Sequence, residues 1–279
     1  MKSKFLSSFL VLFSTVCFGV TDSVQAQSIL LEPNNVTAIQ LEMLRPNAHY
    51  TDISNSSFTF FLSGRVRVGR DHLLRAEVPF VNYKEEGGVE YWRTPEDDSQ
   101  FGNPYLGLDV GSPESGFQGE FGVRAPVVSE LTETAAAGSG SDYIERIEAF
   151  LPDLVPIYMG LNYRVKTENG FGMRFRMVPV FWIWVGERSE VDNDIYVLYS
   201  GQAWYQDKKV GVGGGITGRI ITTGDASGFD ERSFHQFDFF ANYTFGTWMP
   251  GFQIRFPLDD SIRARGINPT YSLSLGWKL

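Results

Sequence analysis

Cysteine and histidine are scarce in this chain of 279 residues, and their scarcity limits its chemistry. Cys17 is the single cysteine, and there are only three histidines. A chain with no thiol beyond position 17 cannot rely on disulfides, zinc–thiolate sites or cysteine nucleophiles in a domain that follows. The sequence therefore implies no metal site and no cofactor.

The first residues have the pattern of a secretory signal. Lys2 and Lys4 supply a positive start, residues 5–20 an apolar core, and Val24-Gln25-Ala26 a small-residue cleavage site. The apolar core is short for a membrane-spanning helix, and no stop-transfer flank follows it. We therefore expect residues 1–26 to be a signal peptide and residues 27–279 to form one domain.

Basic charge and long apolar runs are also lacking. The formal net charge is −9, and removing the signal (two lysines and Asp22) makes it −10. Nucleic-acid binding needs a basic surface, so we expect no nucleic-acid partner. No stretch after residue 26 is long and apolar enough for a membrane helix. A membrane protein of this sequence would have to be a closed barrel, which the 15% aromatic content and 29 glycines fit.

Long and short connections alternate along the chain between segments of alternating polarity. The long ones are 45–55, 84–103, 128–154, 185–194, 222–233 and 259–269, and the short ones are 69–71, 111–116, 166–170, 206–209 and 246–250. Outer-membrane barrels have tight periplasmic turns and extended external loops. The pattern predicts an all-β fold, a transmembrane antiparallel up-and-down barrel of about 12 strands, with 10 or 14 as alternatives. Both termini would then be periplasmic.

Within each segment the residues alternate with period two. In one example, Leu74, Ala76 and Val78 oppose Arg75 and Glu77. The polar set is rich in arginine, and all the long connections fall at one end of the strands. We therefore expect the apolar set to face lipid and the polar set to face the lumen. Aromatic residues near segment ends are candidates for interfacial girdles; these are Tyr83, Tyr205, Trp248 and Trp277.

The last segment resembles the assembly signal of bacterial outer-membrane proteins. It alternates apolar residues from Tyr271 to Leu279, although Leu279 stands where the final residue is usually phenylalanine. The resemblance implies the barrel-assembly machinery as a partner during biogenesis.

Strand parity assigns a charged set to the lumen. The basic members are Arg65, Arg67, Arg75, Arg124, Arg164, Arg174, Arg176, Arg219 and Arg255, and the acidic members are Glu42, Glu77, Asp109, Glu120 and Asp238. One interpretation is that arginine rings favour anionic solutes such as carboxylates or acidic saccharides. The other is that arginines and acids pair across strands and make a narrow barrel rigid.

The third long loop contains a predicted short helix. Asp142 can cap it with Glu145 three residues later, and Pro152 follows the stretch. The helix would span 142–151 and form an apolar face, which makes it a candidate constriction; the face comprises Ile144, Ile147, Phe150 and Leu151. It could constrict the barrel mouth, or it could only brace neighbouring loops.

Catalysis by a barrel-embedded lipid hydrolase needs a serine and a histidine together. Ser233 lies near His235 on the expected external side, so a pair at the rim is one alternative. The sequence has no His-x-Ser-x-Gly cluster of the outer-membrane phospholipase kind, and we therefore expect no enzyme.

Two segments resemble a known family. They are Gln100-Phe-Gly-Asn-Pro-Tyr-Leu-Gly-Leu-Asp109 and Gly119-Glu-Phe-Gly-Val-Arg-Ala-Pro126. The first is similar to the Gly-Asp/Asn-Pro opening, and the second to the Lys/Arg-x-Pro step, of the transporter-like outer-membrane family associated with the MetA pathway of phenol degradation. The resemblance implies a monomeric barrel that passes small hydrophobic or aromatic compounds. An arginine-rich lumen suits an aromatic acid better than a purely hydrophobic solute.

These observations predict a barrel in the bacterial outer membrane that takes up small solutes passively. Its partners would be outer-membrane lipid and a small-molecule solute, and it would act as a monomer. Two alternatives stay open: a structural or adhesive surface barrel with an occluded lumen, and the barrel hydrolase.

Overall fold

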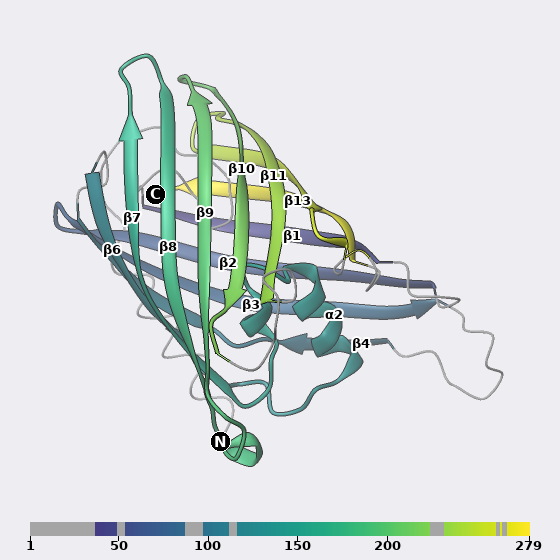
Figure 1. Ribbon diagram of the computed structural model, residues 1–279. Helices are drawn as coiled ribbons and strands as arrows, with labels where there is room; N and C mark the ends of the chain where they lie inside the picture. Colours follow the sequence, from purple (N-terminus) through teal and green to yellow (C-terminus); the bar gives the residue numbers. More distant parts are fainter. Residues whose placement is uncertain are drawn as a thin grey trace.

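The computed structural model describes residues 37–48, 54–86, 97–111, 116–223, 232–260, 263 and 267–279 (Figure 1). The signal-peptide prediction for residues 1–26 lies outside them. The strands are β1 (Ala38–Ala48), β2 (Ser54–Val68), β3 (His72–Glu86), β4 (Asp97–Phe101), β5 (Tyr105–Gly111), β6 (Gly116–Arg124), β7 (Leu154–Lys166), β8 (Phe171–Trp184), β9 (Asp194–Gln206), β10 (Val210–Ile221), β11 (Ser233–Tyr243), β12 (Trp248–Pro257) and β13 (Ile267–Lys278).

The strands form one closed antiparallel barrel. Apart from β4 and β5, each strand pairs with its neighbours in sequence, and β13 pairs with β1 to close the barrel. Both β4 and β5 pair with β3, one at each end of it, so they are two halves of a single wall strand interrupted at 102–104. The wall therefore has twelve strands, and the predicted up-and-down barrel is confirmed.

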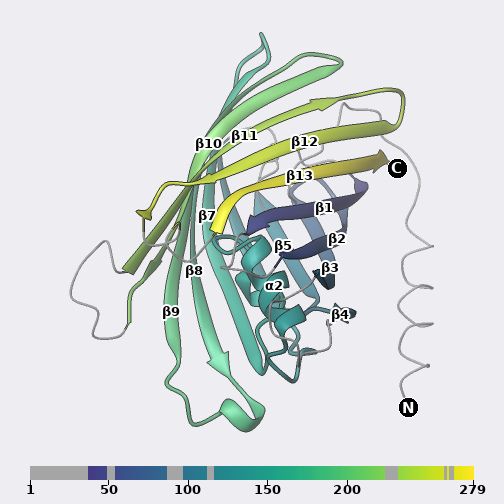
Figure 2. The same cartoon turned by 90° about the vertical axis from the view of Figure 1, so that its right-hand side faces the viewer.

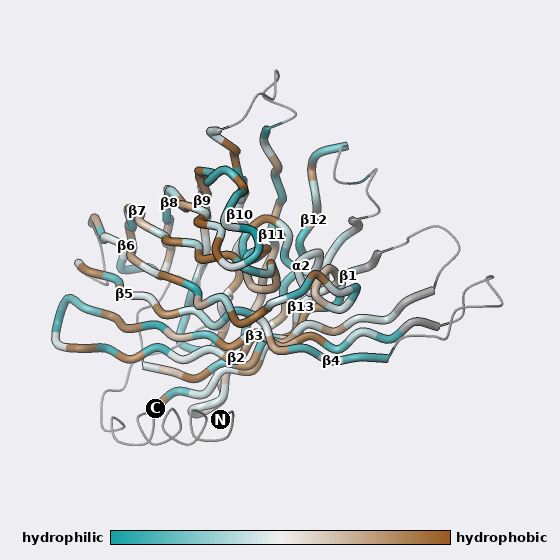
Figure 3. Tube along the Cα trace, turned by 90° about the horizontal axis from the view of Figure 1, so that it is seen from below, coloured by the Kyte–Doolittle hydropathy of each residue, from teal (hydrophilic) through white to brown (hydrophobic). Residues whose placement is uncertain are grey.

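The outer wall is apolar, as the period-two pattern predicts. Large side chains on the outer parity are exposed, with 51% for Leu62, 60% for Leu161 and 53% for Phe175. Polar side chains on the other parity are buried inside the barrel, as with Arg75 and Glu120. Figure 3 shows the alternation of hydrophobic and hydrophilic residues along β2 and β3. An apolar outer face on a closed barrel is what a lipid environment requires.

Tight turns lie at one end of the barrel and long connections at the other. Gly69, Gly170 and Gly246 have positive φ values of 72°, 89° and 61° in three of the tight turns. Glycine has no Cβ and adopts this backbone region at little cost, so it suits these turns. At the same end Trp248 stacks on Trp277 with ring centroids 5.4 Å apart, which is where the sequence places an interfacial girdle.

Tyr83 does not belong to that girdle. Its side chain is 5% exposed and points inward, where its hydroxyl lies 3.5 Å from Glu133. The interpretation failed because the inward face near the external end of β3 is itself apolar and packs against other residues.

The long connection between β6 and β7 enters the barrel. It contains helix α2 (Glu133–Ser141) and a 3₁₀ turn, η1 (Ile147–Ala149). Figure 2 shows α2 inside the barrel beside β1 and β2, and α2 also contacts β3. Within the described residues, no helix has the length and apolar character needed to cross a membrane.

Close packing inside the wall generates the first prediction. The ring of Tyr105 covers Gly107 and Gly122, which are opposite each other on β5 and β6, and a Cβ at Gly122 would overlap that ring. We expect Gly122→Ala to destabilise the barrel by about 1–3 kcal/mol, the usual cost of overpacking. The measurement is the temperature at which detergent-solubilised protein loses its folded electrophoretic mobility.

The matched control is Gly140→Ala in α2, where a Cβ would have open space around it. That change should leave the midpoint unchanged or raise it slightly, because alanine favours helix. Equal midpoints for the two variants would contradict the packing argument.

Candidate functional site

The lumen is filled by residues 128–153, which we call the plug. It begins after β6 and ends at β7, so both of its ends are held at the external rim. Helix α2 is capped at its N-terminus by Thr132, whose side chain accepts a hydrogen bond of 3.0 Å from the Ala135 amide. Its small residues, with three alanines and two glycines, let it pack close to the wall.

The helix expected at 142–151 is not there. Asp142 caps the end of α2, and only three residues of the expected span form a helical turn. The Glu145 amide does donate to the Asp142 carboxylate at 3.4 Å. However, the same carboxylate binds Arg146 at 2.5 Å and Arg255 at 3.1 Å, and these ion pairs override the local helical preference.

Arg146 is the central contact between the plug and the wall. Its guanidinium binds Glu42 of β1 at 2.8 Å and Glu77 of β3 at 3.2 Å, as well as Asp142 of the plug itself. The guanidinium also lies 3.6 Å from the centroid of the Phe61 ring. Arg146 is 1% exposed, so these contacts are made away from bulk water, where charge-assisted hydrogen bonds are strongest.

A second group of polar contacts joins the plug to the opposite wall. Glu148 lies 2.8 Å from Arg219 of β10 and accepts a hydrogen bond of 2.9 Å from the Trp182 indole. Arg219 also donates to the Ile144 carbonyl at 2.8 Å. The plug is therefore tied to β1, β3, β8, β10 and β12 by side chains from all round the barrel.

Asn103 holds both ends of the plug. It is fully buried in the break between β4 and β5, and its amide nitrogen donates to the carbonyls of Glu148 at 3.0 Å and Leu151 at 2.7 Å. Its amide oxygen accepts hydrogen bonds from the backbone of Val127 at 2.8 Å and Val128 at 2.9 Å. The side chain of one wall residue thus satisfies four backbone groups of the connection.

The four apolar plug residues that the sequence predicts as one face contact different walls. Phe150 packs with Leu44, Phe61 and Val81, while Ile144 packs with Phe234. The half-buried Ile147 and Leu151 pack against the cluster around Tyr158 and Trp182. They occupy the lumen together, and their role in constricting it for a solute stays a prediction.

Below the plug, towards the tight turns, lies a second charged group that we call the arginine layer. It consists of Arg65, Arg75, Arg164, Arg174 and Arg176 with Asp109 and Glu120. Arg75 binds Asp109 at 2.6 Å, and Arg176 binds Glu120 at 2.6 Å. Among the described residues, the layer holds five arginines and two carboxylates.

The register places like charges opposite each other in this layer. Arg65 faces Arg75 on β2 and β3, Asp109 faces Glu120 on β5 and β6, and Arg164 faces Arg174 on β7 and β8. Like charges directly opposite each other destabilise a strand pair. The predicted pairing of arginines with acids does occur, but mostly along diagonals and between non-adjacent strands.

The remaining predicted lumen residues lie at other levels. Arg124 binds Glu77 at 2.7 Å beneath the plug, and Arg255 binds Glu42 at 3.1 Å while its Nε lies 3.8 Å from Asp238. Arg67 is exposed at the rim with the tight turns and does not join the buried set. The arrangement gives the wall eight inward arginines among the described residues, and a role of any of them in contacting solute stays a prediction.

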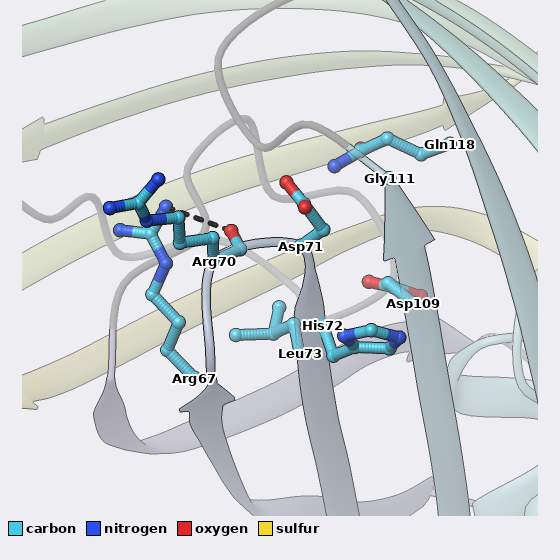
Figure 4. Close-up of a pocket in the computed structure, with 8 residues that line it drawn as sticks. All are labelled: Arg67, Arg70, Asp71, His72, Leu73, Asp109, Gly111 and Gln118. Carbon is cyan, nitrogen blue, oxygen red and sulfur yellow. Dashed lines mark hydrogen bonds between the residues drawn. The ribbon is translucent and has the colours of Figure 1, made fainter.

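A small hollow adjoins the arginine layer on the side of the tight turns. Its empty volume is about 190 Å³, and its lining includes Arg67, Arg70, His72, Asp109 and Gln118 (Figure 4). Arg67 donates to the Arg70 carbonyl at 3.3 Å across the turn. Asp109 belongs to both the hollow and the arginine layer, so the two are continuous.

His235 forms a pair with an acid near the external rim. Its Nδ1 lies 3.0 Å from the Asp259 carboxylate, and its ring is 5.9 Å from that of Tyr199. Ser233, the serine near it in sequence, is only 1% exposed. A nucleophile in that position is closed to a lipid substrate in this conformation.

Sequence reasoning missed Asn103, Arg146 and Glu148, which attach the plug. Asn103 and Arg124 lie in the two segments that carry the family resemblance. The resemblance was therefore one signal in the sequence that marked these residues. A further signal was parity: Val178, Val180 and Trp182 share the inward side with Arg174 and Arg176. Apolar residues on both faces of the external half of β8 indicate burial on both faces.

The Asn103 contacts generate a second prediction. Asn103→Ala leaves two carbonyls and two amides of the connection without this partner, and each buried group left unsatisfied costs about 1–3 kcal/mol. We expect the plug to leave the lumen at least roughly tenfold more often, which trypsin cleavage after the buried Arg146 would measure.

The control is Asn169→Ala in an exposed turn, where Asn169 makes only local contacts. It should be cleaved at the rate of the unaltered protein. An Asn103→Ala protein that resists trypsin equally well would contradict the role of Asn103.

Glu145 generates a third prediction, on pH. Its side chain is fully buried, and among the described residues neither carboxylate oxygen has a hydrogen-bond partner. Burial raises its pKa from 4.5 to about 7, with Asp142 adding to the rise and Arg176, Arg255 and Arg146 opposing it. The inserted plug therefore favours protonated Glu145, and this stabilisation is present below pH 4.5 and is lost as pH rises through about 7.

We expect the plug to leave the lumen more often at pH 8 than at pH 5, and Glu145→Gln to reduce that difference. Hydrogen exchange of residues 133–150, corrected for the intrinsic pH dependence of exchange, measures it. Glu168→Gln in an exposed turn is the control. An unchanged pH dependence in Glu145→Gln would show that another group is responsible.

Comparison with known proteins gives likeness at the level of fold. The sequence matches no protein-family model and no curated protein. The structure is similar to the COG4313 outer membrane channel from Pseudomonas putida F1, with a TM-score of 0.58 and 11% identity, covering 94% of this chain and 100% of that one. It is also similar to the NanC porin, with a TM-score of 0.51 and 10% identity, covering 87% and 100%.

A third similar structure is the translocator domain of the autotransporter NalP from Neisseria meningitidis, with a TM-score of 0.51 and 9% identity, covering 88% and 89%. At these identities the likeness shows the fold alone. The similar structures are outer-membrane barrels, two of them a channel and a porin. The closed barrel and its apolar outer wall place this protein in the bacterial outer membrane.

Proposed function

We propose that this protein is an outer-membrane channel for passive uptake of small solutes, closed in the present conformation by its plug. The observation that carries the proposal is the way Arg146 attaches the plug. It is held by ion pairs and hydrogen bonds to the wall, at 2.8 Å from Glu42 and 3.2 Å from Glu77. Such contacts can be exchanged for contacts with water or solute without breaking the barrel.

A barrel that needs only rigidity can fill its lumen with side chains of its own wall. Here a separate connection, attached at both ends to the external rim, supplies Asp142, Arg146 and Glu148 to wall partners. When the plug moves out, all wall hydrogen bonds between strands remain. Displacement of the plug is thus an opening that leaves the fold intact.

The proposed solute class is small anions, including aromatic acids. The resemblance to the family associated with the MetA pathway implies small hydrophobic or aromatic compounds, while the lumen is rich in arginine. An aromatic acid satisfies both, because a guanidinium binds its carboxylate and rings such as that of Tyr105 line the lumen.

The alternative of a structural or adhesive surface barrel is favoured by one observation. The plug packs against the wall on several sides, with Phe150 against Leu44, Phe61 and Val81 and with Ile144 against Phe234. A barrel that never opens would look the same in this conformation. Whether the plug moves is therefore the deciding question.

A crosslink between the plug and the wall is the fourth prediction. Thr59 of β2 and Ser141 of the plug have hydroxyl oxygens 2.7 Å apart. In a Cys17→Ser background, Thr59→Cys/Ser141→Cys should form a disulfide that keeps the plug inside. Combined with Arg146→Gln, the oxidised protein should stay closed in planar bilayers, and reduction should release openings because the plug has lost its central ion pairs.

The control is the Arg146→Gln protein without the two introduced cysteines. Oxidation should leave its conductance in planar bilayers unchanged. If Arg146→Gln alone fails to fold, Asn103→Ala replaces it as the loosened background. Openings that persist in the crosslinked, oxidised protein would show that the plug does not close the lumen. If the protein shows no conductance after the disulfide is reduced, the structural barrel is favoured.

A further inference from the structure

Glu148 of the plug binds the wall with only one of its two carboxylate oxygens. Its Oε1 lies 2.8 Å from Nη1 of Arg219 on β10 and accepts a hydrogen bond of 2.9 Å from the Trp182 indole on β8. Its Oε2 is buried and has no hydrogen-bond partner among the described residues. A buried carboxylate oxygen without a donor is costly, so Glu148 is an incomplete ligand for this part of the wall.

The guanidinium of Arg219 is also only partly used. Its Nε donates to the Ile144 carbonyl at 2.8 Å, while its Nη2 is buried and has no hydrogen-bond partner within the part of the chain that the structure describes. An arginine binds a carboxylate best when two N–H groups donate in parallel to the two oxygens. Here Glu148 presents one oxygen, so one donor and one acceptor stay unused within a single ion pair.

Aromatic rings surround this ion pair. The guanidinium of Arg219 lies 5.3 Å from the centroid of Tyr196 and 5.8 Å from that of Trp182, and the two rings are 4.2 Å apart. The ring of Trp184 lies 5.8 Å from that of Trp182. Three rings beside one positive charge are the chemical complement of an aromatic ring that bears a carboxylate.

The ion pair and its rings lie close to the external mouth of the barrel. Trp182 and Arg219 each stand two residues before the external end of their strands, and Tyr196 stands two residues after the start of its strand. Strands rise about 3.3 Å per residue, so the site is roughly 7 Å below the strand ends. These strands, β8, β9 and β10, are adjacent in the wall (Figure 1). Trp184 and Ile221 at their ends are half-buried, so a solute from outside meets this aromatic surface first.

We propose that Arg219, Trp182 and Tyr196 form a binding site for an aromatic monocarboxylate, and that Glu148 occupies the place of the solute's carboxylate until the solute displaces it. The incoming carboxylate takes the space that the Glu148 carboxylate leaves and accepts two parallel hydrogen bonds from the guanidinium. The aromatic ring of the solute then packs on the aromatic surface towards the mouth.

Displacement of Glu148 has a consequence for the plug. Glu148 is one of the side chains that tie the plug to the wall, and the Glu148 carbonyl and Asn103 hold the same turn. Exchange of its carboxylate for that of the solute therefore loosens the plug, so that the solute promotes its own entry. The opening step rests on the proposed channel function, whereas the exchange at Arg219 does not depend on it.

The mouth above the site favours a solute with a single negative charge. The connection between β8 and β9 carries three exposed acids, Glu187, Glu190 and Asp192, against one arginine, Arg188. The guanidinium of Arg188 lies over the Trp184 ring at 5.7 Å. The net negative charge of this connection repels a second carboxylate on the solute. A dicarboxylate should therefore bind more weakly than a monocarboxylate of similar size.

Competition between the solute and Glu148 is tested by calorimetric titration of the detergent-solubilised protein with benzoate. Glu148→Gln should bind benzoate roughly tenfold more tightly than the unaltered protein, because a neutral amide holds the guanidinium less strongly than a carboxylate does. Arg219→Gln should abolish binding. The matched control is Arg67→Gln, an exposed arginine at the opposite rim, which should keep the unaltered affinity. Opposite effects of the two partners of one ion pair indicate competition, which a purely structural pair would not produce.

Two further ligands test the chemistry of recognition. Benzamide, an uncharged molecule of the same shape, should not bind, and phthalate should bind more weakly than benzoate. If Arg219→Gln fails to fold, Arg219→Lys replaces it; lysine keeps the charge but loses the fork of donors, and should weaken benzoate binding several-fold.

Three results would overturn the site: no benzoate binding even in Glu148→Gln, equal binding of benzamide, or unchanged binding in the Arg219 variant. Phthalate binding as tight as that of benzoate would overturn the preference for a single charge.

Opening is tested second, by single-channel recording of the unaltered protein with benzoate on both sides of a planar bilayer. Benzoate should raise the frequency of openings in a saturable way, benzamide should not, and Glu148→Gln should open more often without any solute. If benzoate binds but leaves the frequency of a conducting protein unchanged, displacement of the plug by the solute is refuted and the channel stands. No conductance under any of these conditions would refute the proposed channel and leave the binding site standing.

Discussion

The structure depends on the pairing of charges that are shut away from water inside the barrel. Arg146 shows the constraint most clearly: it brings one positive charge from the plug to Glu42 and Glu77 of the wall and to Asp142 beside it. Removing one partner of such a buried group costs about 3–5 kcal/mol, because the other charges are left uncompensated. The position of the plug, the fold of residues 142–146 and the closure of the lumen all follow from this requirement.

The inward face of the wall changes character along the barrel axis. Near the tight turns it carries arginine and acid, while near the external rim it carries Phe61, Val81, Val180 and Trp182. Apolar side chains facing a water-filled lumen would be unfavourable, so this half of the wall needs something to pack against. The plug supplies Phe150 and Ile144 for that purpose, and its charged tip meets the polar half of the wall.

The barrel could be predicted from the sequence because its signals are local. Period-two alternation, short turns on one side and long loops on the other each arise within a few residues, and together they predict twelve strands with the correct sides facing lipid and lumen. The helix at 142–151 was wrong because Asp142 has partners 113 residues away in sequence, such as Arg255, which no local pattern shows. Arg67 was assigned to the lumen by parity alone, although it lies at the rim where parity no longer decides burial.

The plug itself is the part that local reasoning could not place. Asn103 is an unremarkable residue until the fold brings it against Leu151 and Val128, and only the resemblance of residues 100–109 to a known segment marked it. The central claim is that the plug closes the lumen reversibly. Single-channel recording of the unaltered protein tests it most directly: long closed periods interrupted by discrete openings are expected, whereas either a constantly open conductance or lasting silence under all voltages would contradict it.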